Sequence, residues 1–342
     1  MNIELLKQTA KQMVAPGKGL IAADESAGTC KTRFDAVGVE CTEENRRLYR
    51  ETIVTAPGLE QYVSGVIFFD ETIRQKDENG KPLAQILAEI GVLPGIKVDA
   101  GAKELALHPG EKVTEGLDGL RDRLAEYVTL GAKFAKWRAV ITVGADIPSE
   151  ACIHANAHAM ARYAALCQEA DIVPIVEPEV LIDGDHSLER CEAVTRATLT
   201  DLFSELIEQN VLLEGAILKA SMVIAGKGAA QQSSPAEVGA ATVRVLKETV
   251  PAELAGVVFL SGGQADEQAS ANLDAMNKIG GAPWPLTFSY SRAIQNPVLK
   301  IWAADIKNNV GKAQEALIFR AKMNALASEG KYSNEMETER SY

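Results

Sequence analysis

The sequence predicts an α/β protein that folds as a (β/α)8 TIM barrel, a single domain followed by a short C-terminal tail. Short strand-like runs recur along the chain, segments of helical character separate them, and no low-complexity linker interrupts the 342 residues. Eight such units in one domain of this length favour a closed parallel barrel over an open doubly wound sheet. We assign residues 1–332 to the barrel and residues 333–342 to a flexible tail.

The expected strands share apolar and β-branched composition. They cover residues 20–24, 62–70, 95–101, 132–140, 171–180, 214–222, 256–263 and 285–292. Helical segments are expected at residues 43–55, 82–90, 116–130, 149–169, 188–209, 236–249, 265–278 and 297–328. Thr42, Ser187 and Ser234 stand where helix N-caps are expected, and Pro235 follows at a first helical position.

Composition narrows the class of protein. Hydrophobic residues make up 46% of the chain and charged residues 24%, as in ordinary globular proteins. The net charge of −12 argues against nonspecific nucleic-acid binding, which requires a basic surface. No run of about 18 apolar residues indicates a membrane span, and the N-terminus lacks a signal-peptide core, so a cytoplasmic location is expected.

Metal or disulfide chemistry has little support in the sequence. The five cysteines are odd in number and have no CxxC spacing, which argues against a disulfide framework or a structural zinc site. The histidine pair His154 and His158 lies in a segment expected to be an outer helix, where a solvated or structural role is favoured. We expect no metal and no cofactor.

Three lysines occupy strand-like segments in which a charged amine is costly to desolvate. Lys219 lies in AILKASM, Lys97 in GIKVD and Lys136 in FAKWR. In a parallel barrel, side chains near the C-terminal ends of the strands converge on one mouth. An amine held there among apolar neighbours and other cations has its charged form disfavoured, so the neutral amine becomes available as a nucleophile.

Lys219 has the most apolar flanks and is our candidate nucleophile towards a carbonyl carbon. Lys136 is expected to supply positive charge. The simpler alternative is that these lysines only form ion pairs with barrel carboxylates. Three lysines at separate strand ends make that alternative less favoured.

Carboxylates and anion-binding groups complete the expected site. Glu177 and Glu179 share one strand face, and Asp24 ends the first strand, so proton donors and acceptors approach from different sides. Ion pairing is an equally favoured role for Glu179. Ser261, Gly262 and Gly263 with Arg292 suit a phosphate after the last two strands, and Ser26, Thr29, Arg33 and Lys97 form a second candidate anion site.

Several of these motifs together resemble one known family. DESAGT, TEENRR, GIKVD, FAKWR, IVPIVEPE, LEGAILK, FLSGGQ and TFSYSRA occur in this order over residues 20–294. The chain resembles the class I fructose-1,6-bisphosphate aldolases over nearly its whole length. The resemblance implies a lyase of glycolysis and gluconeogenesis that cleaves fructose 1,6-bisphosphate to dihydroxyacetone phosphate and glyceraldehyde 3-phosphate without a cofactor.

The same resemblance implies a role for each motif residue. Lys219 would form the Schiff base, Glu177 and Asp24 would move protons, and Lys136 and Glu179 would complete the catalytic group. The implied substrate-binding residues are Ser26, Arg33, Lys97, Arg138, Ser261, Gly262, Gly263, Ser289 and Arg292. The resemblance also implies a cytoplasmic homotetramer, and a terminal Tyr342 that reaches back towards the site.

Three departures from the family pattern and two other functions stay open at this point. Ala220 and Ser221 follow the lysine where Pro-Asn is common, Ser291 stands where Gly is common, and Thr29 stands where Ser is common. A Schiff-base aldolase for another phosphorylated ketose, such as fructose 1-phosphate, is one alternative. A catalytically silent binding or scaffold protein is the other.

Overall fold

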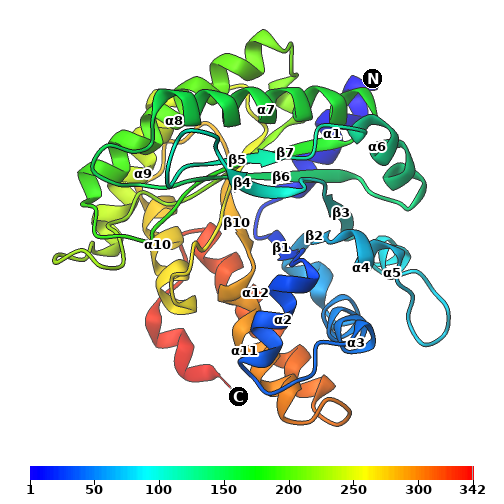
Figure 1. Ribbon diagram of the computed structural model, residues 1–342. Helices are drawn as coiled ribbons and strands as arrows, with labels where there is room; N and C mark the ends of the chain where they lie inside the picture. The colour runs from blue at the N-terminus through cyan, green and yellow to red at the C-terminus, as the bar shows by residue number, and fades with distance from the viewer. Residues whose placement is uncertain (341) are drawn as a thin grey trace.

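The computed structural model describes residues 1–340 and 342, and its centre is a closed barrel of parallel strands. Around the barrel the order is β1-β10-β9-β8-β7-β6-β3-β2 (Figure 1). The strands are β1 (Gly19–Ala23), β2 (Val63–Phe68), β3 (Leu93–Lys97), β6 (Phe134–Ile141), β7 (Val173–Val180), β8 (Ile217–Ala220), β9 (Gly256–Phe259) and β10 (Leu286–Tyr290). The predicted (β/α)8 TIM barrel is therefore confirmed.

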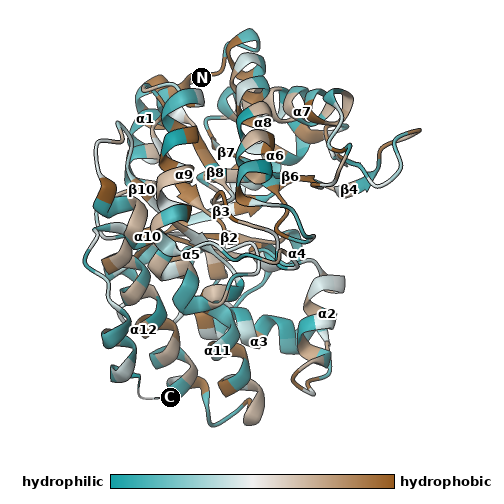
Figure 2. Ribbon diagram, turned by 90° about the vertical axis from the view of Figure 1, so that its left-hand side faces the viewer, coloured by the Kyte–Doolittle hydropathy of each residue, from teal (hydrophilic) through white to brown (hydrophobic). Residues whose placement is uncertain are grey.

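The strands are buried on both faces, because helices cover the outside and side chains fill the inside. The interior is apolar near the N-terminal ends of the strands, where Leu20, Phe134, Ile175 and Val258 pack in one cluster. Helix α1 (Ile3–Met13) contributes its buried apolar side chains to this same cluster. Figure 2 shows the hydrophobic strands at the centre and hydrophilic patches on the surrounding helices. The N-terminal end of the barrel is thus closed by a packed apolar core.

The main helices follow the strands as expected. They are α3 (Glu43–Val54), α5 (Leu83–Glu89), α6 (Leu120–Thr129), α7 (Glu150–Glu169), α8 (Leu188–Glu208), α9 (Pro235–Thr249), α10 (Asp266–Ile279), α11 (Arg292–Ala304) and α12 (Val310–Ser328). Thr42, Ser187 and Ser234 are N-caps whose side chains accept backbone N–H bonds. Ser234 and Glu237 form a capping box, so these cap assignments are confirmed.

The single helix predicted at 297–328 is wrong, because the chain breaks between α11 and α12. Asp305 ends the first helix and its carboxylate accepts hydrogen bonds from the backbone N–H groups of Lys307 and Asn308. A side chain that bonds the backbone in this way stabilises a turn in competition with the helix. Helix α12 then begins after the turn, at Val310.

Three further elements were not predicted. Helix α2 (Ala27–Asp35) follows β1, the short α4 (Asp70–Arg74) follows β2, and an antiparallel hairpin of β4 (Gly101–Glu104) and β5 (Lys112–Glu115) follows β3. The hairpin extends away from the barrel body in Figure 2. All three are insertions at the C-terminal ends of strands, the end where a barrel builds its site.

The C-terminal tail contains a short 3-10 helix, η3 (Asn334–Glu339), that is joined to α12 by an ion pair. The Arg320 guanidinium is fully buried and donates to both carboxylate oxygens of Glu337, at 2.7 and 2.8 Å. The Tyr332 hydroxyl donates to the same carboxylate at 2.8 Å.

Among the helices that the structure describes, none is long and apolar enough to cross a membrane.

Candidate active site

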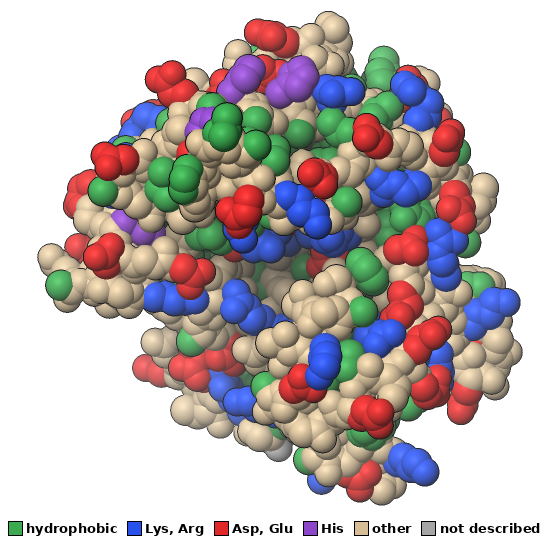
Figure 3. Space-filling view, in the orientation of Figure 1, with side chains coloured by type: hydrophobic (Ala, Val, Ile, Leu, Met, Phe, Trp, Pro, Cys, Tyr) green, Lys and Arg blue, Asp and Glu red, His purple; other side chains and the backbone are tan. Residues whose placement is uncertain are grey.

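A cavity of about 630 Å³ opens at the C-terminal ends of the barrel strands. Lys and Arg side chains surround a hollow on this face of the molecule (Figure 3). Nearly every candidate site residue lines the cavity: Asp24, Ser26, Arg33, Lys97, Lys136, Arg138, Glu177, Glu179, Lys219, Ser261, Gly262, Ser289 and Arg292. The convergence expected from strand ends is therefore present.

Lys219 lies on β8, and its amine faces a carboxylate on the neighbouring strand. The residue is 3% exposed, and its Nζ lies 3.2 Å from Glu177 Oε1 on the adjacent β7. The flanking residues Leu218 and Ala220 are buried in the apolar layer outside the barrel. Alternation along the strand therefore directs the single polar side chain inwards.

Glu177 lies between two amines rather than one. Its Oε2 lies 3.4 Å from Lys136 Nζ, which in turn contacts Asp24 Oδ2 at 2.7 Å. The four charged groups thus form one continuous row, Lys219–Glu177–Lys136–Asp24, which comes from β8, β7, β6 and the residue after β1. Each side chain in the row is at least nine-tenths buried.

The charges in this row fix one another's protonation. Burial alone would raise the pKa of Asp24, but the ammonium groups of Lys136 and Lys219 overcome it and lower that pKa to about 2. Burial alone would lower the pKa of Lys136, but Asp24 and Glu177 raise it above its ordinary range. Lys136 is consequently a permanent positive charge, and Asp24 a permanent negative one, at neutral pH.

Two further ion pairs lie at the mouth. Arg138 donates to Glu179, and burial and the Glu179 carboxylate act in opposite directions on the arginine, whose pKa is raised overall. Lys97 Nζ lies 2.8 Å from Asp99 Oδ1. Glu179 therefore positions a cation, which is the ion-pairing role weighed from the sequence.

Three buried polar atoms in the cavity wall have no hydrogen-bond partner among the described residues. They are Ser289 Oγ, one terminal nitrogen of Arg33, and Glu177 Oε2, whose ion pair with Lys136 at 3.4 Å is not a hydrogen bond. Buried polar groups in native proteins are nearly always paired, so unpaired ones in a cavity are suited to the polar groups of a ligand. Their types, a carboxylate, a hydroxyl and a guanidinium, suit a polyhydroxylated anion.

A second buried network, centred on Glu25, was missed by the sequence analysis. The Glu25 carboxylate accepts hydrogen bonds from Arg33, from Arg50 at 2.5 Å and from the Ser291 hydroxyl at 2.6 Å. Gln295 also donates to it, at 3.1 Å. Glu25 stands in DES between two residues that were identified, but its partners lie up to 270 positions away, so no local pattern indicated them.

Two candidate site residues do not line the cavity. Gly263 lies just outside it, next to the side chains of Arg292 and Lys227. Tyr342 packs edge-on against Phe319 of α12, with ring centroids 5.8 Å apart, and the Arg340 guanidinium lies over its ring. The structure thus places the Tyr342 ring against α12, outside the cavity lining. The catalytic role of Tyr342 stays a prediction.

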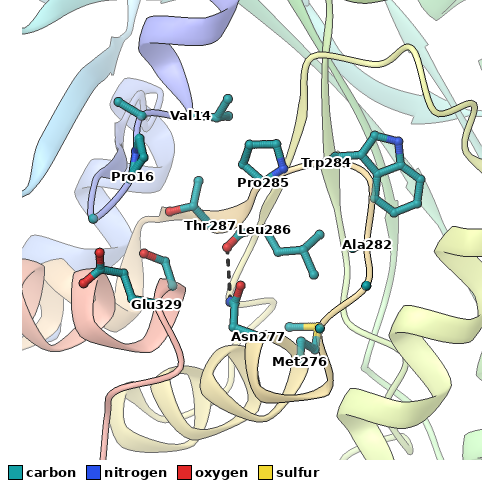
Figure 4. A pocket seen from close by; sticks show the side chains of 15 residues that line it. Val14, Pro16, Met276, Asn277, Ala282, Trp284, Pro285, Leu286, Thr287 and Glu329 are labelled. Carbon is teal, nitrogen blue, oxygen red and sulfur yellow. Dashed lines mark hydrogen bonds between the residues drawn. The ribbon is translucent and has the colours of Figure 1, made fainter.

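The histidine pair considered from the sequence lies on an outer helix, away from the cavity. His154 and His158 are on α7, where both rings face Glu205 of α8. Among the described residues, no group of three His, Cys, Asp or Glu side chains is placed to hold a metal ion. A smaller cavity of about 250 Å³ at the opposite end of the barrel is lined by Val14, Pro16, Trp284 and other mainly apolar groups (Figure 4).

Comparison with known proteins decides the family. The family profile described as "Fructose-bisphosphate aldolase class-I" matches residues 5–342. The chain belongs to the class-I fructose-bisphosphate aldolases. The family identification, the aldolase assignment and the lyase class predicted from the sequence are thereby confirmed.

Individual relatives agree with this family. "Probable fructose-bisphosphate aldolase class 1" of Xanthomonas campestris pv. campestris is 62% identical over 97% of this chain and 99% of its own length. "Fructose-bisphosphate aldolase 4, cytosolic" of Arabidopsis thaliana is 50% identical over 94% of this chain and 82% of its own. A solved structure of the Plasmodium falciparum aldolase, in complex with TRAP and a small-molecule inhibitor, superposes with a TM-score of 0.95 at 48% identity. That superposition covers 97% of this chain and 96% of the other.

Proposed function

We propose that Lys219 is the Schiff-base nucleophile of a reversible aldol cleavage of fructose 1,6-bisphosphate. The Schiff-base mechanism is general for the family. The buried row Lys219–Glu177–Lys136–Asp24 is the observation that supports its assignment to these residues. Of the two lysines in the row, Lys136 is locked as a cation by two carboxylates. Lys219 contacts a single carboxylate oxygen, so a proton transferred to Glu177 frees its amine.

Glu177 is suited to the proton transfers that follow. The Lys219 amine attacks the ketose C2, and Glu177 protonates the departing hydroxyl so that water leaves and the iminium forms. The C4 hydroxyl then gives its proton to Glu177 or to Asp24, the C3–C4 electron pair moves into the iminium, and the aldehyde departs. The enamine is protonated at C3, for which the family resemblance suggests Tyr342, and water releases the second product. Lys136 holds both carboxylates in place throughout.

The phosphate groups are assigned to the two cationic ends of the cavity. Ser261, Gly262 and Arg292 would hold the phosphate on the ketose side, with Gly263 and Ser289 beside them. Ser26, Arg33 and Lys97 would hold the other, and Arg138 lies between the two groups. Two separate anion sites favour a bisphosphate over fructose 1-phosphate, because a monophosphate would occupy only one of them.

A homotetramer in the cytoplasm is the assembly that we propose. Large apolar side chains remain on the surface of the single chain, among them Leu107 at 98% and Ile207 at 60% exposure. Such residues are suited to burial against another subunit. The Arabidopsis relative named cytosolic supports the location. Light scattering of the purified protein tests the assembly, and a monomeric mass would overturn it.

The deciding experiment is covalent trapping. Borohydride added with fructose 1,6-bisphosphate should reduce the iminium and leave a stable adduct on Lys219, located by peptide mass spectrometry. An adduct on Lys136 or another lysine would overturn the assignment. Cleavage of fructose 1,6-bisphosphate measured beside fructose 1-phosphate separates the main function from the monophosphate alternative, and an absence of turnover with either would favour the scaffold alternative.

A further inference from the structure

The loop between β8 and α9 carries a lysine that the sequence analysis did not single out. Lys227 stands in the tripeptide Gly226-Lys227-Gly228. This tripeptide is bonded to the loop that follows β7 by three backbone hydrogen bonds of 2.8–2.9 Å, from the N–H groups of residues 226, 227 and 228 to the carbonyl groups of His186, Ile182 and Gly184. The lysine backbone is therefore fixed at the rim of the barrel mouth.

The two glycines are what allow the loops to approach so closely. A Cβ at Gly226 would lie 2.5 Å from the carbonyl oxygen of Gly184, and a Cβ at Gly228 would lie 3.1 Å from the same atom. A side chain at position 226 would therefore clash with backbone that cannot move independently. The local sequence thus holds Lys227 at a defined position, although its side chain is about half exposed.

The amine of Lys227 lies beside the proposed phosphate site on the ketose side. A Cβ built on Gly263 would lie 2.8 Å from Lys227 Nζ and 3.2 Å from a terminal nitrogen of Arg292. Two cations, one from the loop between β8 and α9 and one from the first residue of α11, therefore converge on one glycine of the SGG turn. Gly263 has a φ of +97°, a conformation that favours glycine, so the turn exposes backbone rather than a side chain to both cations.

We propose that Lys227 is a second cationic group for the ketose-side phosphate, acting together with Arg292 across the SGG turn. This inference rests on the proposed function and adds to it a residue outside the cavity lining. Like charges placed so close together repel each other unless an anion lies between them. The carboxylate of Asp183, 70% exposed and 3.1 Å from Lys227 Nζ, supplies part of that charge in the free protein. A bound phosphate dianion then competes with Asp183 for the lysine.

The test compares the two triose phosphates in the condensation direction. Dihydroxyacetone phosphate places its phosphate on the ketose side, and glyceraldehyde 3-phosphate places its own at the other site. Lys227→Gln should raise the KM for dihydroxyacetone phosphate about fivefold, the effect of one partly exposed charge contact, and leave the KM for glyceraldehyde 3-phosphate and the kcat nearly unchanged. An equal rise for both trioses, or no rise for either, would overturn the proposal.

Asp183→Asn should change the KM for dihydroxyacetone phosphate in the opposite direction. If Asp183 competes with phosphate, its removal should lower the KM for dihydroxyacetone phosphate by about twofold, because the lysine is then free to bind the substrate. A purely structural ion pair predicts the reverse, a loss of stability in both variants and no gain in affinity. A raised or unchanged KM in Asp183→Asn would contradict the competition.

Lys7→Gln is the matched control. Lys7 forms an ion pair of the same 3.1 Å length with Glu214, at comparable exposure, but on α1 at the other end of the barrel. This variant should change neither KM. Borohydride trapping on Lys219 at saturating dihydroxyacetone phosphate distinguishes a failure of the Lys227 role from a failure of the proposed function. If the Lys227→Gln variant still forms the Lys219 adduct and its KM for dihydroxyacetone phosphate is unaltered, only the role of Lys227 is overturned. If the wild-type protein forms no adduct on Lys219, the proposed function is overturned.

Discussion

The two ends of the barrel treat buried polar groups in opposite ways. At the N-terminal end, the Ser64 hydroxyl lies within hydrogen-bond distance of the carbonyl groups of Met13 and Gly19, and the Thr287 hydroxyl donates to the backbone carbonyl of Lys18. At the C-terminal mouth, Glu177 Oε2 and Ser289 Oγ are buried without a hydrogen-bond partner among the described residues. The first end is satisfied by the chain itself, whereas the second keeps, beside its internal ion pairs, polar atoms that a ligand can bind.

This contrast implies that stability and activity are separable in this molecule. A paired polar group contributes to folding, whereas an unpaired buried one costs free energy that substrate binding recovers. Substitutions at the mouth that keep the Lys136–Asp24 ion pair should therefore reduce turnover with little loss of stability. Substitutions at the N-terminal end should do the reverse. The following experiments test that separation, in order of expected effect.

The largest effect is expected at Lys219. Lys219→Met removes the amine that forms the iminium, so kcat should fall by at least about ten-thousandfold. The thermal unfolding midpoint should stay within a few degrees, because an apolar side chain of similar length fills the same space. Residual turnover above this level would show that another lysine performs the chemistry.

Glu177→Gln comes next. The amide keeps the shape of the side chain and cannot take up a proton, so kcat should drop by about a hundredfold to a thousandfold. Stopped-flow measurement of iminium formation and of product release shows which step slows. A variant with wild-type kcat would place the proton transfers on Asp24 instead.

Gly256→Ala is the corresponding change at the N-terminal end. A Cβ there would lie 2.7 Å from the Val14 side chain, so the free energy of unfolding should fall by about 1–3 kcal/mol. The kcat of the folded fraction should be unchanged. Gly311→Ala, where nothing lies within 4 Å, is the control and should not destabilise the protein. A large loss of kcat in Gly256→Ala would break the separation between the two ends.

The stability of the folded state should depend on pH through Asp24 at the mouth. The pKa of Asp24 is lowered to about 2, below its ordinary 3.8, so its carboxylate stabilises the folded state above about pH 4. That contribution is lost as the pH falls from about 4 to 2, because the proton then binds the folded protein as well. Urea unfolding of the wild type and of Asp24→Asn across this range should show the component only in the wild type.

The sequence predicted the fold and most of the site because both depend on local patterns. Strand ends and caps such as Ser234 are marked within a few residues, and alternation places Lys136 and Glu177 on inner faces. The Glu25 network and the position of Lys227 depend on partners from distant segments, which no local pattern indicates. The break at Asp305 was missed because helical composition continues on both sides of it.

The docked tail also constrains how the terminal tyrosine can be studied. A chain shortened after Tyr332 would lose Glu337 together with Tyr342, and Arg320 would keep only the more distant Asp266 carboxylate, at 3.7 Å. Such a deletion would change folding and catalysis at once. A single hydroxyl removed by Tyr342→Phe, in a chain of full length, addresses the tyrosine alone.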